Sequence, residues 1–318
     1  MEERRLYPLK FIPETASRPW GGVSYLLADL GFADTAVANG WLGGNTISEV
    51  METYLERVSG EKGFEYFGTQ FPVAVRALDV GGRTSLRVNP DDETARVRYD
   101  TFGRPALWII EKAGPGAELC LGFKEDTAPA AFYDACLEGR AYELLHKVVP
   151  VAGEVYPIPP GMVHAAFGPV RIVEISEASG LFFRLMDPSG GRETHLEEAF
   201  DLIDFRRWSE GRPEDLLPLR IMPHTLEGPE MVENGETGGF TVYYCRSVSG
   251  AVSQESFGAV SQGSGHSGGV LFRVPSEDGR AVEPYTLRPG EVLLVPDDIP
   301  DYTILPAGET ASLIEVRI

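Results

Sequence analysis

A short sequence pattern occurs twice in this chain, and it constrains the fold more than any other feature. The pattern is Gly-Glu-Val-x-x-(Ile or Val)-Pro, and it spans residues 153–159 and 290–296. Each copy combines a turn glycine with a short strand, and strand and turn patterns also dominate the segments around both copies. The spacing between the copies is too long for a solenoid. The fold that we expect is therefore a duplicated jelly roll.

The turns that follow the two copies differ. Gly161 and His164 follow the first copy, whereas Asp298 and Asp301 stand at the aligned positions after the second. A neutral imidazole held after a Pro-Pro-Gly turn is a plausible metal ligand, although a lone histidine is more often a satisfied, partly buried residue. The second turn has no such ligand, so we expect the carboxy-terminal barrel to be structural.

A polar segment at residues 209–215 is interpreted as a linker between two domains. Residues 1–210 are predicted to form the first barrel, with a helical insertion near residues 124–148 and a closing helix near residues 194–206. Residues 211–318 are predicted to form the second barrel. The predicted fold class is therefore all-β dominated, with two jelly-roll barrels and a small helical insertion.

Capping-box patterns mark two predicted helix starts. They are Thr46-Ile-Ser-Glu49 and Thr194-His-Leu-Glu197, and apolar residues follow both at helical spacing. His146 and His195 fall on predicted helices, where we interpret them as surface residues. No chemistry is assigned to these helices.

The composition narrows the range of partners. The 318-residue chain has 28 Lys and Arg against 48 Asp and Glu, a formal net charge of −20, which argues against a nucleic acid or an anionic membrane as partner. An anionic ligand would need a local cluster of basic residues. Without a signal-like or membrane-spanning apolar run, a cytoplasmic protein is expected. Three cysteines without Cys-x-x-Cys spacing are interpreted as idle thiols.

Residues 85–93 are predicted to form a strand and a turn. Alternation places Leu86 and Val88 on one face, and Ser85, Arg87 and Asn89 on the other. A small barrel that binds a ligand keeps such polar side chains in its interior. The alternative is a register shifted by one residue, with Arg87 in solvent. The acidic residues 91–93 are interpreted as a solvated turn.

Several motifs occur in a fixed order along the chain. They are Arg18-Pro-Trp-Gly-Gly22, Val37-Ala-Asn-Gly40, Leu78-Asp79, residues 85–93, Ile158-Pro-Pro-Gly-Met-Val-His164, Arg184-Leu-Met-Asp187 and Arg192-Glu-Thr-His-Leu196. In this order they resemble the landmarks of the type I mannose-6-phosphate isomerases. The resemblance implies two cupin (jelly-roll) barrels and the interconversion of mannose 6-phosphate and fructose 6-phosphate.

The resemblance also implies a zinc site that is degenerate here. The family's ligands are the Gln and His of a Gln-x-His-Pro-Asp strand, a Glu shortly before a Trp, and the His of a Pro-x-Gly-x-x-His turn. The matching positions are Arg87, Asn89, Ala106 and His164, so His164 is the one retained ligand. Arg87 would repel a cation, and Ala106 removes a carboxylate that would be costly without one. We therefore predict no catalytic zinc, unless other ligands complete the site.

The same resemblance assigns roles in a substrate site. Arg184 matches a substrate-facing arginine and is the predicted catalytic residue, while Trp20, Arg87, Asn89 and His164 are predicted to bind the substrate. Arg87 and Arg184 together can hold a phosphate or carboxylate. The predicted partner is a sugar or sugar phosphate. Two functions follow: an isomerase homologue with impaired or lost metal-dependent activity, or a metal-free, non-catalytic double cupin that binds a sugar or an anionic sugar derivative.

Overall fold

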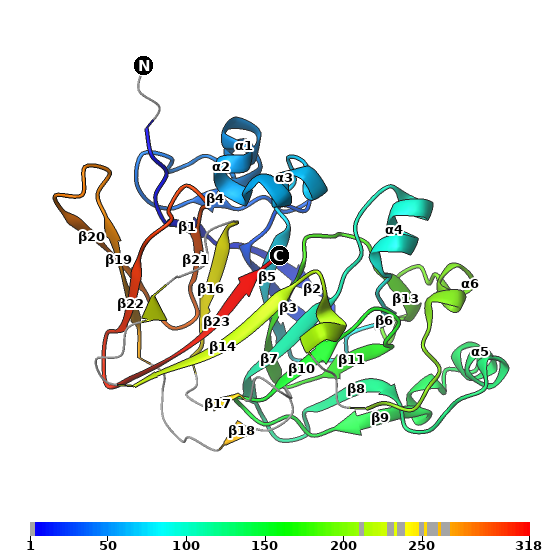
Figure 1. Cartoon of the computed structure of the whole chain (residues 1–318). Helices are drawn as coiled ribbons and strands as arrows, with labels where there is room; N and C mark the ends of the chain where they lie inside the picture. The colour runs from blue at the N-terminus through cyan, green and yellow to red at the C-terminus, as the bar shows by residue number, and fades with distance from the viewer. Residues whose placement is uncertain are drawn as a thin grey trace.

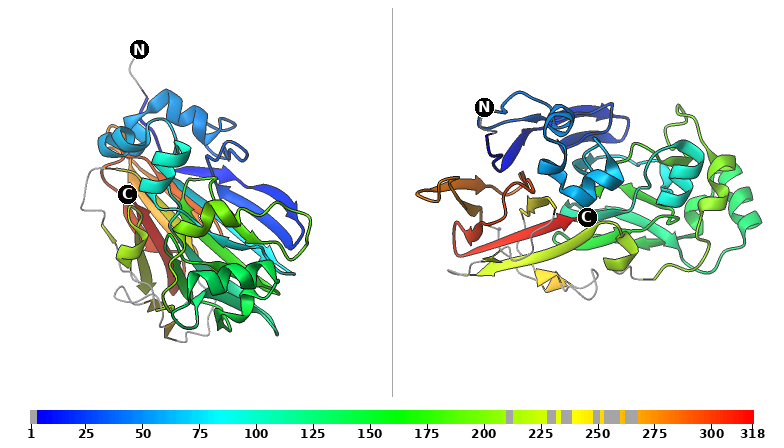
Figure 2. Two further views of the ribbon diagram at one scale, coloured as in Figure 1. Left: turned by 90° about the vertical axis from the view of Figure 1, so that its right-hand side faces the viewer. Right: turned by 45° about the horizontal axis from the view of Figure 1, so that its top comes forward.

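The computed structural model describes residues 4–209, 213–227, 232–233, 239–247, 251–252, 260–261 and 268–318. Strands dominate these residues and form several antiparallel sheets, as the sequence predicted. Two barrels lie side by side, with short helices at one end and along one side (Figures 1 and 2). None of the described helices is long and apolar enough to cross a membrane.

The N-terminal barrel is built from two sheets. The first has the strand order β10-β7-β12-β5-β3-β2 and the second β13-β6-β11-β8-β9. The first sheet contains β2 (Glu14–Arg18), β3 (Gly21–Leu27), β5 (Val73–Val80), β7 (Ala106–Ala113), β10 (Val155–Ile158) and β12 (Val170–Glu177). The second contains β6 (Leu86–Val88), β8 (Glu118–Phe123), β9 (Leu145–Val148), β11 (His164–Phe167) and β13 (Phe183–Met186).

The C-terminal unit is also built from sheets. Its larger sheet has the order β14-β23-β16-β21-β1-β4, and a smaller one has the order β15-β22-β19-β20. The larger sheet contains β1 (Leu9–Ile12), β4 (Ala36–Val37), β14 (Arg220–Glu227), β16 (Thr241–Cys245), β21 (Val292–Val295) and β23 (Thr310–Arg317). The others are β15 (Val232–Glu233), β19 (Val270–Pro275), β20 (Val282–Leu287) and β22 (Thr303–Pro306), with a separate pair β17 (Ala251–Val252) and β18 (Val260–Ser261).

The repeat that predicted the duplication has the same local structure in both copies. Its strands are β10 and β21, one in each barrel. Gly153 and Gly290 both have positive φ, at 96° and 86°, which a glycine adopts without strain. The strand β1 pairs with β21, so Leu9 lies opposite Leu294 and the start of the chain contributes to the C-terminal sheet. The division near residue 210 stays a prediction.

Alternation in β12 separates two cores. Val173 and Ile175 lie in an apolar layer between the two large sheets, together with Val242 and Ile314 from the C-terminal sheet. Ile172 faces the other way, into the N-terminal barrel. Both faces of the strand are covered, so Glu174, Ser176 and Glu177 are buried along with its apolar residues. Any ionisable group on the inner face must therefore find its partners inside the barrel.

Short helices flank the barrels. They are α1 (Ile47–Tyr54), α2 (Glu56–Ser59), α3 (Glu61–Phe67), α4 (Asp92–Tyr99), α5 (Pro129–Leu137), α6 (Leu196–Ala199) and the 3₁₀ turns η1 (Ala141–Glu143), η2 (Phe200–Leu202) and η3 (Pro213–Leu216). The predicted capping box at Thr46 and Glu49 is present. Helices α5 and α6 pack on the outer face of the second sheet of the N-terminal barrel, against residues such as Leu86 and Val88.

Three local predictions are wrong. Residues 145–148 form a strand that pairs with β8, so His146 is not on a helix, and its ring stacks on Trp208 at 4.3 Å. The predicted capping box at residues 194–197 is absent, because α6 begins after His195 and has no side-chain cap. The predicted turn after Pro90 is the start of α4, where Asp91 caps the helix by accepting from the Thr94 N–H at 2.7 Å.

Candidate functional site

A cavity of about 370 Å³ opens inside the N-terminal barrel. Trp20, Arg87, His164 and Arg184, four of the five residues predicted from the sequence, line it. Three strands of the second sheet deliver three of these side chains, because His164 and Arg184 both lie opposite Arg87 in the strand register. The neighbouring Leu86 and Val88 point outward to the helices. The predicted register is thus confirmed, and the shifted alternative is wrong.

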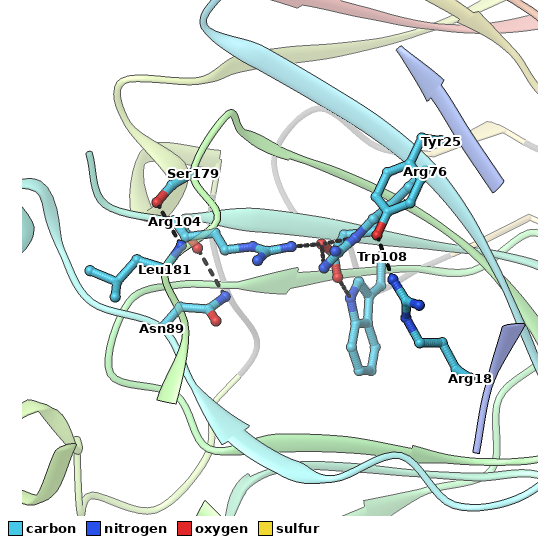
Figure 3. A network of polar contacts seen from close by, with 9 residues as sticks. Arg18, Tyr25, Arg76, Asn89, Arg104, Trp108, Ser179 and Leu181 are labelled. Carbon is cyan, nitrogen blue, oxygen red and sulfur yellow. Dashed lines mark hydrogen bonds and ion pairs between the residues drawn. The ribbon is translucent and has the colours of Figure 1, made fainter. Parts of the chain in front are cut away.

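Asn89 is buried, but it lies apart from the residues that line the cavity. Its Nδ2 donates to the backbone carbonyl of Arg104 at 3.0 Å (Figure 3). Ala106 is fully buried in the apolar core of the barrel. The side chain of Asn89 therefore holds the neighbouring segment in place, and its predicted contact with a substrate stays a prediction.

His164 is buried and uncharged. Its Nδ1 lies 2.9 Å from the carbonyl oxygen of Met162, and because a carbonyl can only accept, Nδ1 carries the proton and Nε2 keeps its lone pair. Burial lowers the pKa of His164 to about 4. The ring meets Trp108 edge-on at a centroid distance of 5.4 Å. His164 thus offers one neutral nitrogen acceptor.

The floor of the cavity contains a buried ion network that the sequence analysis missed. Glu174 Oε1 accepts hydrogen bonds from Arg76 Nε and Arg104 Nη2, both at 2.9 Å, and Oε2 accepts from Trp108 Nε1 at 2.8 Å. Figure 3 shows Arg76, Arg104 and Trp108 converging on this point. Burial alone would raise the pKa of Glu174, but the two guanidinium groups outweigh it and hold the pKa below its ordinary value.

The signal for this network was present in the sequence. Glu174 is an acidic residue that stands between the apolar residues Val173 and Ile175 in a strand whose two faces are both buried. Such a carboxylate needs a cationic partner. The partner was not predictable from spacing, since Arg76 is 98 residues away in sequence and is brought opposite Glu174 by the pairing of β5 with β12.

Arg87 stands beside this network without a counterion. Its side chain makes no hydrogen bond or ion pair to the described residues, and its Nε is buried without an acceptor. The guanidinium carbon lies 4.4 Å from the ring centre of Phe182. Burial, followed by repulsion from Arg76 and Arg104, lowers the pKa of Arg87 to about 9. The group is still cationic at neutral pH, so an anion in the cavity would relieve an unfavourable charge.

Further arginines line the rim of the cavity. Arg192 forms an ion pair with Asp187, with Nη2 2.7 Å from Oδ1. Arg184 donates instead to neutral groups, with Nε 3.3 Å from Ser85 Oγ and Nη1 2.6 Å from the carbonyl of Glu193. The residues that line the cavity include five arginines, against the single carboxylate of Glu174. A protein with a net charge of −20 thus contains a locally cationic pocket.

The side chains present do not form a zinc site. Across the described part of the chain, no group of three or more His, Cys, Asp or Glu side chains is placed to hold a metal ion. In the cavity, His164 offers one nitrogen, while Glu174 is engaged by three donors. Zinc sites need three or four good ligands, and a neighbouring guanidinium opposes a cation. The donor set fits an anion better than a metal.

The fold and the cavity define a strand-rich double barrel of the cupin type, with a polar pocket inside its first barrel. The fold is similar to that of the mannose 6-phosphate isomerase from Bacillus subtilis, with a TM-score of 0.75 over 98% of this chain and 99% of that one at 19% identity. A variant of phosphomannose isomerase from Salmonella typhimurium has a TM-score of 0.69, with 98% and 100% covered at 12% identity.

Sequence comparison narrows the class further. The chain is 25% identical over 274 residues to the mannose-6-phosphate isomerase of Streptococcus mutans, which covers 83% of this chain and 79% of that protein. It is 27% identical over 222 residues to mannose-6-phosphate isomerase ManA of Bacillus subtilis, which covers 62% and 68%. No family model matches the chain. The protein is therefore mannose-6-phosphate isomerase-like.

Proposed function

We propose that this protein binds an anionic sugar in the pocket of its N-terminal barrel and has lost metal-dependent aldose–ketose isomerisation. The relatives are named mannose-6-phosphate isomerases, which supports a sugar phosphate or a closely related compound as the ligand. The observation that carries the proposal is the position of Arg87, which lies in the pocket between His164 and Arg184 without a counterion. An anion is attracted to this position and a divalent cation is repelled from it.

The ionisable groups of the pocket are better suited to binding than to proton transfer. Isomerisation needs a base that removes a proton next to a carbonyl, and an electrophile that holds the resulting oxyanion. Glu174 is held by three donors and its pKa is lowered, so it is a poor base. His164, with a pKa of about 4, is also a weak proton acceptor. The arginines can hold an oxyanion, but the strong base is missing from the described pocket.

Aromatic side chains complete the ligand-binding surface. Trp20, Tyr25 and Trp108 line the same cavity as the arginines. Flat apolar rings pack against the C–H faces of a sugar, while guanidinium groups pair with its anionic substituents. The volume of about 370 Å³ lies within the range of small-molecule sites.

The proposal is tested by measuring metal content, ligand binding and turnover on one preparation. We expect protein purified without chelator or nickel to contain less than about 0.1 equivalent of divalent metal, a level at which single-site occupancy is negligible. Mannose 6-phosphate should bind in titration calorimetry without being converted to fructose 6-phosphate. Near-stoichiometric metal that disappears in His164→Ala, together with turnover, would overturn the proposal.

Restoring the family's ligand set sharpens the test. The triple variant Arg87→Gln, Asn89→His, Ala106→Glu rebuilds the resembled set around His164, and we expect it to bind zinc where the parent protein does not. The matched control carries the same three changes and His164→Ala, and it should not bind zinc. Equal zinc uptake by the parent, the triple variant and the control would contradict the assignment of this pocket.

A further inference from the structure

The arginines of the pocket form two groups at different depths. Arg76 and Arg87 line the floor together with Glu174, and Arg104, which does not itself line the cavity, bonds to Glu174 as Arg76 does. One carboxylate thus faces three guanidinium groups, and Arg87 is the group that no described side chain neutralises. With three positive groups and one negative group, the floor has an excess of buried positive charge. A ligand that reaches the floor is stabilised there by a negative group of its own.

The rim is also unbalanced, and the aromatic ring of Phe182 lies close to guanidinium groups of both the floor and the rim. Asp187 neutralises Arg192, but Arg18 and Arg184 have no carboxylate partner among the described residues. Arg18 Nη2 bonds to the hydroxyl of Tyr25 at 3.2 Å (Figure 3), and the guanidinium carbon of Arg184 lies 5.6 Å from the ring centre of Phe182. A second anionic group would therefore be favoured at the mouth.

The two positions suit different anions. The guanidinium carbon of Arg87 lies over the ring of Phe182, and the rings of Trp108 and His164 line the same cavity. A planar carboxylate matches one guanidinium fork through two parallel hydrogen bonds. The half-exposed rim, with two guanidinium groups and the hydroxyl of Ser85 nearby, suits a tetrahedral phosphate, which has more acceptor oxygens to satisfy. A neutral aldose carbonyl at the floor would leave Arg87 uncompensated.

We infer that the ligand of this pocket is a phosphorylated sugar acid, whose carboxylate pairs with Arg87 and whose phosphate pairs with Arg18 and Arg184. This inference rests on the proposed function, because it assigns the chemical class of the sugar in the same pocket. The free Nε2 of His164 accepts a hydrogen bond from a hydroxyl of the sugar acid near its carboxylate. The ligand differs from an aldose phosphate by one anionic group at the end of the chain that reaches the floor.

The test compares four ligands by titration calorimetry at physiological salt. They are a hexonic acid 6-phosphate, mannose 6-phosphate, the hexonic acid without phosphate, and inorganic phosphate. We expect the acid phosphate to bind at least about tenfold more tightly than mannose 6-phosphate, because one charge-assisted bidentate pair is added. Equal or tighter binding of mannose 6-phosphate would overturn this inference and leave the proposed function standing. Binding of none of the four would overturn both.

Variants assign each anionic group to its position. Arg87→Gln should remove the preference for the acid phosphate over mannose 6-phosphate, whereas Arg184→Gln should weaken both phosphorylated ligands by the same factor. Arg280→Gln, an equal charge change at an exposed position on the other barrel, is the matched control and should alter neither. If Arg87→Gln does not fold, Arg87→Lys keeps the charge and loses the fork, and should reduce the preference. A preference that survives both Arg87 variants would overturn the inference.

Discussion

The two barrels fill their interiors differently. In the N-terminal barrel, Arg76, Arg87, His164 and Glu174 line a cavity, and Arg104 bonds to Glu174. In the described part of the C-terminal barrel, rings pack against each other, with Tyr243 5.0 Å from Phe272 and its hydroxyl 2.7 Å from that of Tyr302. A packed apolar core stabilises a fold, whereas buried charges weaken it unless each is paired. We therefore expect the N-terminal barrel to bind the ligand and the C-terminal barrel to contribute stability.

The two barrels also differ in how their buried charges are balanced. In the C-terminal barrel, Glu315 lies between His224 Nε2, at 2.7 Å, and Arg317 Nε, at 2.6 Å. The side chain of Glu315 is buried, but the side chains of His224 and Arg317 are partly exposed to solvent. Around the cavity of the N-terminal barrel, by contrast, the lining includes five arginines and one carboxylate, and Arg87 has no counterion among the described residues. The local excess of cations, rather than burial of charge as such, distinguishes the N-terminal barrel.

The largest expected effect comes from removing the carboxylate of the floor. Glu174→Gln would leave Arg76 and Arg104 buried without an anion, and we expect the free energy of unfolding to fall by about 3 to 5 kcal/mol. The matched change Glu315→Gln in the other barrel should lower it by only about 1 kcal/mol, because water can reach Arg317. Urea unfolding at neutral pH measures both. Equal losses would remove the distinction between the two barrels.

Acid should weaken the N-terminal barrel through His164. The pKa of His164 is lowered to about 4 in the folded protein, so the unfolded chain binds a proton first and stability falls as the pH drops from about 6.5 to 4. At pH 5 this residue alone should reduce the free energy of unfolding by about 2 kcal/mol relative to pH 7. His164→Gln should show a correspondingly smaller loss in denaturant unfolding at the two pH values. The same acid dependence in parent and variant would contradict the buried, neutral assignment.

A rise in pH should weaken the same barrel through Glu177, which is buried near Asp92. Burial, with the charge of Asp92, raises the pKa of Glu177 to about 9. The folded protein keeps the proton that the unfolded chain releases above about pH 4.5, so stability falls as the pH rises towards 9. Glu177→Gln should therefore raise the free energy of unfolding at pH 6 by about 2 kcal/mol and change it little at pH 4. A loss of stability at pH 6 would contradict this.

The smallest effect is expected at Arg87. Arg87→Met removes an unpaired guanidinium from the pocket, and it should stabilise the ligand-free protein by about 1 kcal/mol, because functional residues are often unfavourable for folding. It should also remove the additional rise in melting temperature that a hexonic acid 6-phosphate produces over mannose 6-phosphate in the parent. Thermal unfolding with and without ligand measures both. Destabilisation of the ligand-free protein would mean that Arg87 has a structural partner.

Much of the fold could be predicted from local patterns. The repeat around Gly153 and Gly290, the capping box at Thr46 and the alternation that turns Arg87 inward all depend on residues that are neighbours in sequence. The short-range rules failed where two local structures competed. The Asp91 region forms a helix cap rather than a turn, and residues 145–148 form a strand because β8 offers them a pairing edge.

The sequence by itself predicted the double barrel, and strand alternation together with the order of its motifs predicted Arg87 and His164 in one pocket. The tertiary structure alone decided which contacts the buried polar side chains make. It brings Arg76, Arg104 and Trp108 onto Glu174 and turns Asn89 away to a backbone carbonyl. The physical reason is that strand alternation specifies the face of a side chain, whereas its partners depend on which distant strands lie beside it.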